Sequence, residues 1–165
     1  MRTIRLLWLI VIILLLFQGY NSYWKLPDRM ATHFNLSGMP NGWSDKDNFF
    51  MLWYLMLIGI NLMFYVPSLF MHKIPPSLVN LPNKQYWFET EERKKIAMTK
   101  IRNLLFITML IVNIYFGLIF ETITRGNTPS KHQINPVWLF APMGTMLAIT
   151  IIYLLFAFKK PKSQN

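Results

Sequence analysis

Four long runs of the sequence contain no Asp, Glu, Lys, Arg or His, and they constrain the fold more than any other feature. They cover residues 6–23, 49–70, 104–120 and 137–158. Each is close to the ~20 residues with which a helix crosses a ~30 Å hydrocarbon layer. A soluble chain of 165 residues would have no polar element left to cover four such helices. The runs therefore predict an all-α integral membrane protein with four transmembrane helices, at about residues 6–23, 49–70, 104–122 and 137–158.

The first run also has features of a cleaved secretory signal, because Arg2 and Arg5 precede it. It is longer than a usual signal core, however, and the following FQGYNSYW contains no small-x-small cleavage site. We therefore expect a retained helix and a single membrane domain over residues 1–165. The chain has no cysteine, which excludes disulfides, thiol nucleophiles and thiolate metal sites.

Positive charge alternates between the loops. Of the 17 Lys and Arg residues, 12 lie before the first run, between the second and third, or after the fourth. Only five lie in the other two loops. An excess of Lys and Arg is typical of cytoplasmic loops, so both termini and the basic loop 71–103 are expected inside. Loop 24–48 is then expected outside. The net charge of +10 suits anionic lipid headgroups rather than nucleic acid.

The outer loop, residues 24–48, is rich in turn-forming residues. Its segments MATHFN and NGWSD alternate partly and are separated by Gly38, Pro40 and the pair Asn41-Gly42. Such residues favour tight turns, and the loop is therefore expected to be a small β-hairpin or a compact irregular structure. Ser44 and Asp47 have the spacing of a capping box that would start the second helix.

The inner loop, residues 71–103, contains the predicted start of a long third helix. Pro75-Pro76 prevents the second helix from continuing, and the aromatic segment 86–88 is typical of an interfacial anchor. Thr90 is a suitable N-cap, followed by acidic residues in the first turn. Nothing breaks a helical pattern from there to Gly126. The basic first third of this helix is expected to rest on lipid headgroups through Lys94, Lys95 and Arg102.

The polar residues inside the four runs are all neutral, whereas proton relays and ion-coupled carriers usually need ionisable groups at this depth. Hydrogen bonding between helices is the simplest role for them, and a substrate path lined by Asn61 and Asn113 is the alternative. Gly144 and Ala148 form a small-xxx-small pair suited to close helix packing.

No established catalytic or phosphate-binding motif occurs in the chain, so we expect no catalytic residue, no metal and no cofactor. The three histidines, His33, His72 and His132, fall in three different loops. A metal site made by His33 and His132 with carboxylates such as Asp45 or Glu121 is a minor alternative.

Two segments carry a family resemblance. LPDRMATHFNLSGMPNGWSDK, residues 26–46, resembles the signature of a bacterial membrane domain family of unknown function. LPNKQYWFETEERKK, residues 81–95, resembles a second segment found in many of its small members. The same family forms the N-terminal part of the sporulation-delaying-toxin immunity protein, whose second region has a Gly-Ile-Arg-Thr-Pro-like motif that is not found here. The resemblance implies a location in the bacterial plasma membrane. The residues that match the outer motif are His33, Phe34, Asn35, Gly38, Gly42, Trp43 and Lys46.

These observations predict a non-enzymatic membrane protein whose outer loop binds or senses a ligand. The expected partners are the lipid bilayer and either a peptide toxin or another membrane protein. A small transporter or permease subunit acting as an oligomer is one alternative, and a membrane-embedded enzyme is another. For the outer loop itself, the competing interpretation is that it only staples the first two helices together. For the rings of Trp43 and Phe34, the competing interpretation is that they anchor the loop at the membrane interface, and this is the simpler one for Trp43.

Overall fold

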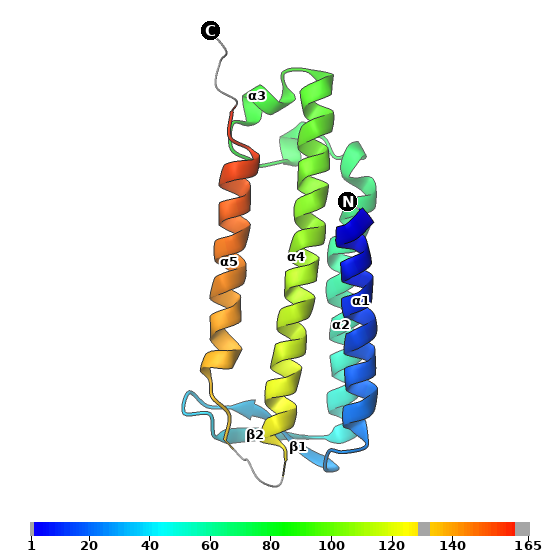
Figure 1. Cartoon of the computed structure of the whole chain (residues 1–165), viewed down its shortest axis with the longest axis vertical. Helices are drawn as coiled ribbons and strands as arrows, with labels where there is room; N and C mark the ends of the chain where they lie inside the picture. Colours follow the sequence, from blue (N-terminus) through cyan, green and yellow to red (C-terminus); the bar gives the residue numbers. More distant parts are fainter. Residues whose placement is uncertain (1, 129–132, 161–165) are drawn as a thin grey trace.

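The computed structural model describes residues 2–128 and 133–160, and within these it is a helical bundle capped by a hairpin (Figure 1). The elements follow one another as α1 (Arg2–Tyr23), β1 (Arg29–Phe34), β2 (Pro40–Asp45), α2 (Lys46–Phe70), α3 (Lys84–Phe88), α4 (Glu91–Gly126) and α5 (Val137–Ala157). Two 3-10 turns, η1 (Met71–Lys73) and η2 (Pro76–Leu78), lie between α2 and α3. The hairpin closes one end of the bundle and α3 lies at the other (Figure 1). We call these the hairpin end and the basic end.

Among the described residues, three helices are long and apolar enough to cross a membrane: α1, α2 together with η1, and α4. This agrees with the first three predicted spans. The fourth predicted span coincides with α5, a helix of 21 residues in which Met143–Ala157 forms a shorter apolar stretch. The protein is therefore mainly helical with three membrane-spanning helices by length and composition, and the four-span count stays a prediction.

Helix α4 is the axis of the fold, since α1, α2, α3 and α5 all pack against it. As predicted, Thr90 is its N-cap, and the Thr90 hydroxyl oxygen accepts a hydrogen bond from the Arg93 N–H at 3.2 Å. The helix then runs unbroken for 36 residues, a length of about 54 Å. It is therefore longer than a ~30 Å hydrocarbon layer, as the sequence indicated.

The predicted capping box at the start of α2 is wrong. Strand β2 runs directly into α2, and the N-cap is Asp45, whose side chain makes no capping hydrogen bond. Ser44 is still part of the strand, where it pairs with Met30. The Asp47 carboxylate accepts a hydrogen bond from the Tyr23 hydroxyl at 2.6 Å instead. The start of α2 is thus held by the neighbouring helix and not by a local cap.

The main core lies between α1, α2 and α4 and is largely aromatic. The rings of Trp53 and Phe116 stack with centroids 3.6 Å apart, and Phe120 lies 4.5 Å from Trp53. Trp53 and Phe120 are almost completely buried. Large flat rings give extensive van der Waals contact, which is what holds helices together where lipid removes the hydrophobic driving force.

A buried amide pair joins the same three helices. The side chains of Asn61 and Asn113 donate to each other's oxygen, both at 2.9 Å. The Trp8 indole N–H donates to the Asn61 oxygen at 2.7 Å. The remaining amide protons bond to carbonyls one turn earlier in each helix. The predicted hydrogen bonding between helices is therefore confirmed for these two residues, which are both buried.

Two packing expectations for the rest of the bundle have different outcomes. No described atom outside α5 lies within 4 Å of a Cβ placed on Gly144, so close packing at the pair Gly144 and Ala148 is not found within the described residues and stays a prediction. Trp87 is not exposed as an interfacial anchor, because it is 5% exposed and its indole N–H donates to the Phe158 carbonyl at 3.1 Å. The basic end of α5 attaches at this point.

Candidate functional site

The outer motif forms an antiparallel hairpin, as one of the two loop predictions stated. Its register pairs Ala31 with Trp43, His33 with Gly42, and Phe34 with Pro40. The ladder is irregular between Ala31 and His33, where β1 has one extra residue. Such a bulge bends and twists a strand, and bulges are frequent next to functional sites.

Asn35 builds the turn of the hairpin. Its side-chain oxygen accepts hydrogen bonds from the backbone N–H groups of Ser37 at 2.9 Å and Met39 at 3.0 Å. Its own N–H donates to the Met39 carbonyl at 2.9 Å. Gly38 adopts a positive φ of 76°, which side-chain-bearing residues rarely reach. Asn35 and Gly38 are therefore occupied in shaping the turn.

The tip of the hairpin is fixed on the segment that precedes α5. The Ile134 N–H donates to the Gly38 carbonyl at 3.0 Å, and the Gln133 side chain donates to the Ser37 carbonyl at 2.9 Å. A Cβ on Gly38 would lie 1.8 Å from the Ile134 carbonyl oxygen. Glycine is thus required here both for its φ angle and for the close approach of the two backbones.

Strand β1 is also bound to the end of α4 by Asn127, a residue that the sequence did not indicate as part of the site. The Asn127 side chain accepts from the Ala31 N–H at 2.7 Å and donates to the Ala31 carbonyl at 2.8 Å. The Asn127 side-chain amide therefore pairs with Ala31 as the backbone of a third strand would. Asparagine after a glycine is a common helix end, but nothing in the sequence connects Asn127 with Ala31, 96 residues earlier.

Two further motif residues pack against glycines. A Cβ on Gly126 would lie 3.1 Å from the Phe34 ring, so this ring rests on the end of α4. A Cβ on Gly42 would lie 3.0 Å from the His33 Cβ and 3.1 Å from its ring. Gly42 therefore allows the exposed His33 side chain to lie across the strand pair.

Lys46 joins the hairpin to the end of α1. Its ammonium group donates to the Asp28 carboxylate at 3.0 Å and to the Leu26 carbonyl at 3.3 Å. It also lies 4.8 Å from the centre of the Tyr23 ring, and its side chain is only 16% exposed. These contacts make Lys46 a structural staple, and the sequence analysis missed Asp28 and Tyr23 as its partners.

Several exposed side chains of the hairpin have no such structural task, and four of them are aromatic or apolar groups or an imidazole. They are His33, Leu36, Met39 and Trp43, and we call them the hairpin surface. Within the described part of the chain, neither His33 nor Trp43 makes a side-chain hydrogen bond or ion pair. Leu36 is 83% exposed and Trp43 is 53% exposed. Exposed apolar groups on a rigid support are typical of a binding surface.

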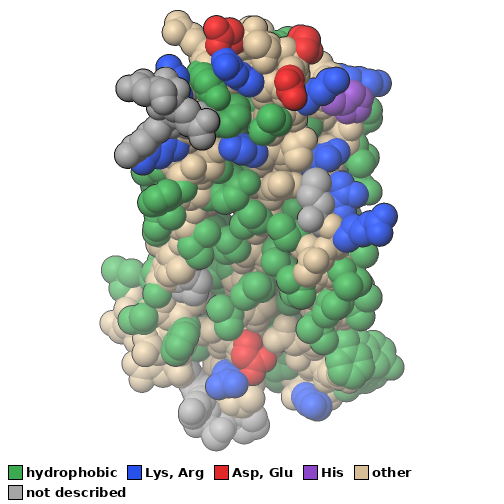
Figure 2. Space-filling model, turned by 45° about the horizontal axis from the view of Figure 1, so that its top comes forward, with side chains coloured by type: hydrophobic (Ala, Val, Ile, Leu, Met, Phe, Trp, Pro, Cys, Tyr) green, Lys and Arg blue, Asp and Glu red, His purple; other side chains and the backbone are tan. Residues whose placement is uncertain are grey.

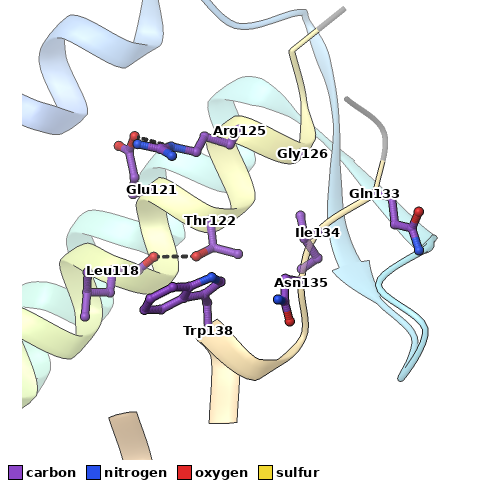
Figure 3. Close-up of a pocket in the computed structure, with 9 residues that line it drawn as sticks. All are labelled: Leu118, Glu121, Thr122, Arg125, Gly126, Gln133, Ile134, Asn135 and Trp138. Carbon is purple, nitrogen blue, oxygen red and sulfur yellow. Dashed lines mark hydrogen bonds and ion pairs between the residues drawn. The ribbon is translucent and has the colours of Figure 1, made fainter. Parts of the chain in front are cut away.

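A pocket of about 330 Å³ lies beside the hairpin, between the end of α4 and the segment 133–138 (Figure 3). The Glu121 carboxylate on one wall accepts hydrogen bonds from Arg125 at 2.8 Å and Gln18 at 3.1 Å. The indole of Trp138 lies beside Thr122 on the other wall (Figure 3). The pocket thus combines an apolar ring with an ion pair whose groups remain partly exposed.

The minor metal-site alternative gains no support. His132 lies outside the described residues. In residues 2–128 and 133–160, no three His, Cys, Asp or Glu side chains lie close enough together to hold a metal ion.

At the basic end, Lys94, Lys95 and Arg102 lie on α4 as expected. Lys94 forms an ion pair with Glu91 at 3.0 Å, and Lys95 is exposed. These residues are separated from the hairpin by the length of the bundle (Figure 1) and do not belong to the outer site.

No curated protein and no solved structure matches the chain. One family model does match, and the matched residues, 9–60, comprise most of α1, the whole hairpin and the first part of α2. All seven outer motif residues lie inside this range, whereas the inner segment 81–95 lies outside it. Residues 9–60 are thus similar to the family described as "Domain of unknown function (DUF1648)", which supports a membrane domain family of unknown function.

Proposed function

We propose that the protein spans a bacterial plasma membrane four times, with both termini in the cytoplasm, and that its hairpin end binds a ligand on the outer side. The apolar helices and the alternating basic loops support this topology. Reporter fusions after Asn165 and after Thr128 are expected in opposite compartments. The same compartment for both would contradict four spans.

The single observation that supports outer binding best is that some residues of the motif fix the hairpin in place while others remain exposed. Asn35, Gly38, Phe34 and Lys46 are used to fix the hairpin on three helices and on the segment before α5. His33 and Trp43 are left exposed on that fixed support. A surface that is already ordered loses less conformational entropy when it binds.

The chemistry of this end suits a peptide. The hairpin surface offers an indole, two apolar side chains and an imidazole, and the neighbouring pocket offers Trp138 and the pair Glu121 and Arg125. A peptide has apolar side chains and polar backbone groups, which could contact the hairpin surface and the pocket together. Together with the family resemblance, this favours a toxin-immunity or toxin-sensing role without catalysis, in which a peptide toxin or a second membrane protein is the partner.

The transporter alternative requires Asn61, Asn113 or the Gly residues to line a cavity. Both side chains are buried, and every amide proton of each is used in a hydrogen bond within the bundle. These hydrogen bonds favour a structural role for the two asparagines, and the transporter alternative then depends on the Gly residues.

The test is survival of toxin-sensitive bacteria that express the chain, challenged with the sporulation-delaying peptide toxin. We expect the chain to raise survival and Trp43→Ala with His33→Ala to remove most of this protection. The free energy of unfolding should change by less than about 0.5 kcal/mol, because both side chains are exposed. Trp24→Ala is the matched control, since Trp24 is an exposed tryptophan at the same end but outside the hairpin.

Lys46→Ala serves as the stapling control and is expected to lower stability and protection together. If Trp43→Ala and His33→Ala also lose stability in step with protection, the hairpin is only a staple and the binding proposal fails. If the unmodified chain gives no protection at all, the toxin is not its ligand.

A further inference from the structure

The basic end contains a groove that the outer-site proposal does not use. It has a volume of about 440 Å³ and runs along the first third of α4, beside η1. Its polar lining includes His72, Lys94, Lys95 and Arg102, and the buried side chains of Met71 and Met98 form its apolar part. Figure 2 shows Lys and Arg side chains gathered around this end, above flanks that are mainly hydrophobic.

The sequence explains why these side chains share one groove. Lys94, Met98 and Arg102 are spaced four residues apart, so they lie above one another on a single face of α4. On the other side, the chain leaves α2 as η1 and packs against α4, because Pro75-Pro76 prevents a longer helix. This turn brings His72 to the same face.

The balance of charge in the groove is positive. Its lining holds three basic side chains, Lys94, Lys95 and Arg102, and one acidic side chain, Glu91. Glu91 is already paired with Lys94 at 3.0 Å. Lys95 is exposed and has no hydrogen bond or ion pair with any residue that the structure describes. The groove therefore retains unneutralised positive charge that can attract an anion.

The groove lies at the depth of lipid headgroups. Met71 directly follows the second apolar run, which ends at Phe70, and Arg102 comes two residues before the third, which begins at Leu104. The mouth of the groove is thus at the boundary between the apolar flank of the bundle and its charged end. Basic pockets between membrane helices on the cytoplasmic side are suited to anionic headgroups.

We propose that this groove binds one phosphate group, with the phosphodiester of an anionic phospholipid as its natural source. Lys94, Lys95 and Arg102 supply charge-assisted hydrogen bonds to the phosphate oxygens, and the imidazole of His72 adds a donor. Met71 and Met98 contact the apolar part of the lipid below the headgroup. Inorganic phosphate has the same anionic chemistry but lacks this apolar part.

The experiment uses the full chain purified in a neutral detergent and native mass spectrometry. Phosphatidylglycerol, phosphatidylcholine and inorganic phosphate are titrated separately. We expect one phosphatidylglycerol to be retained per chain, more tightly than either of the other two. Inorganic phosphate that binds as tightly as the lipid would support the groove as a phosphate site but identify free phosphate as its ligand.

The variant Lys95→Gln removes an exposed cation that contributes no internal contact, so it should fold normally. Because each basic charge near an anionic surface is worth about a factor of five in affinity, we expect about fivefold weaker retention of phosphatidylglycerol. His72→Gln combined with Lys95→Gln should weaken it further. Lys159→Gln is the charge-matched control at the same end, since Lys159 is exposed and does not line the groove.

Two results would overturn the proposal. Equal losses in Lys95→Gln and Lys159→Gln would mean that the attraction is diffuse and comes from the whole basic end. Phosphatidylcholine carries the same phosphodiester, but its quaternary ammonium group cancels the negative charge. Retention of phosphatidylcholine as strong as that of phosphatidylglycerol would therefore mean that the groove does not select an anionic headgroup.

Discussion

Helices α1, α2 and α4 are joined by buried contacts along the bundle, whereas α5 is fastened mainly near its ends. The three-helix part contains the aromatic core and the pair Asn61 and Asn113. No described side chain of α5 is buried, and a Cβ on Gly144 near its middle would touch nothing outside the helix. The basic end of α5 is attached where Phe158 packs with Trp87 and Ala97. At the hairpin end, the segment before α5 is attached through Ile134 and Gly38.

The difference shows how an apolar helix is held in a lipid environment. Apolar side chains gain little by leaving lipid for a helix interface, so hydrogen bonds and close ring packing decide which helices associate. The three-helix part has both kinds of contact. Helix α5 is also apolar, but it is held near its ends, by the ring contact between Phe158 and Trp87 and by polar contacts such as that of the Lys100 ammonium with the Ala157 carbonyl at 2.5 Å.

The largest effect is expected for Trp53→Ala, which removes the central ring of the three-helix part. Loss of a buried aromatic side chain costs about 3 to 5 kcal/mol, from lost contacts and the cavity left behind. The free energy of unfolding, measured by denaturant titration in mixed micelles, should fall by this amount. Trp138→Ala, which removes an exposed tryptophan, should change it by less than 1 kcal/mol. Equal losses would remove the distinction between core and periphery.

Gly38→Ala should cost about 2 kcal/mol and act on the attachment of α5 at the hairpin end. The new methyl group would meet the Ile134 carbonyl, and a residue with a Cβ is disfavoured at a φ of 76°. Pairs of spin labels on α4 and α5 at the hairpin end should show a broader distance distribution. Gly42→Ala is the milder control, because the nearest atoms to its methyl group belong to the His33 side chain, at 3.0 Å or more. An unchanged distribution in Gly38→Ala would mean that the hairpin does not hold α5.

Each of Asn61→Leu and Asn113→Leu should cost about 1 to 3 kcal/mol, because the remaining amide is left buried without its partner. The double variant should cost less than the sum of the two. A double-mutant cycle would then give a coupling of about 0.6 to 1.7 kcal/mol, the range for such bonds in membranes. Strict additivity would show that the two amides do not act as a unit.

Trp87→Phe should have a smaller effect, about 1 kcal/mol, because it removes one hydrogen bond and keeps the ring. The Phe158 carbonyl still accepts from the Asn83 side chain at 3.0 Å. We expect faster protease cleavage near residue 158 without a change in the three-helix part. Combining Trp87→Phe with Asn83→Ala should release the basic end of α5 further; no added cleavage in the combination would contradict this attachment.

The regions differ also in how far the sequence predicted them. The apolar runs predicted the helices because their signal is local, and Thr90 predicted the start of α4 for the same reason. Gly38, Asn41 and Gly42 indicated a hairpin. The contacts that give the hairpin its position could not be predicted, since Asn127 with Ala31 and Ile134 with Gly38 join residues 96 apart along the chain. The capping prediction for Ser44 was wrong because Ser44 pairs with Met30 in the hairpin, and this pairing overrides the local capping pattern.

The smallest effect is expected for Gly144→Ala. The added methyl group meets no described atom outside α5, and alanine favours a helix over glycine by up to about 1 kcal/mol. The variant should therefore be as stable as the parent or slightly more stable. Gly117→Ala is the matched change in the three-helix part, where the methyl group would lie 2.7 Å from the end of the Leu15 side chain. This steric contact should offset the gain in helix propensity, so the Gly117→Ala variant should be less stable than the Gly144→Ala variant.

A clear loss of stability in Gly144→Ala would mean that this face of α5 is packed against something in the membrane. Light scattering in detergent would then show whether that partner is a second copy of the chain, because the variant would shift a dimer toward monomer.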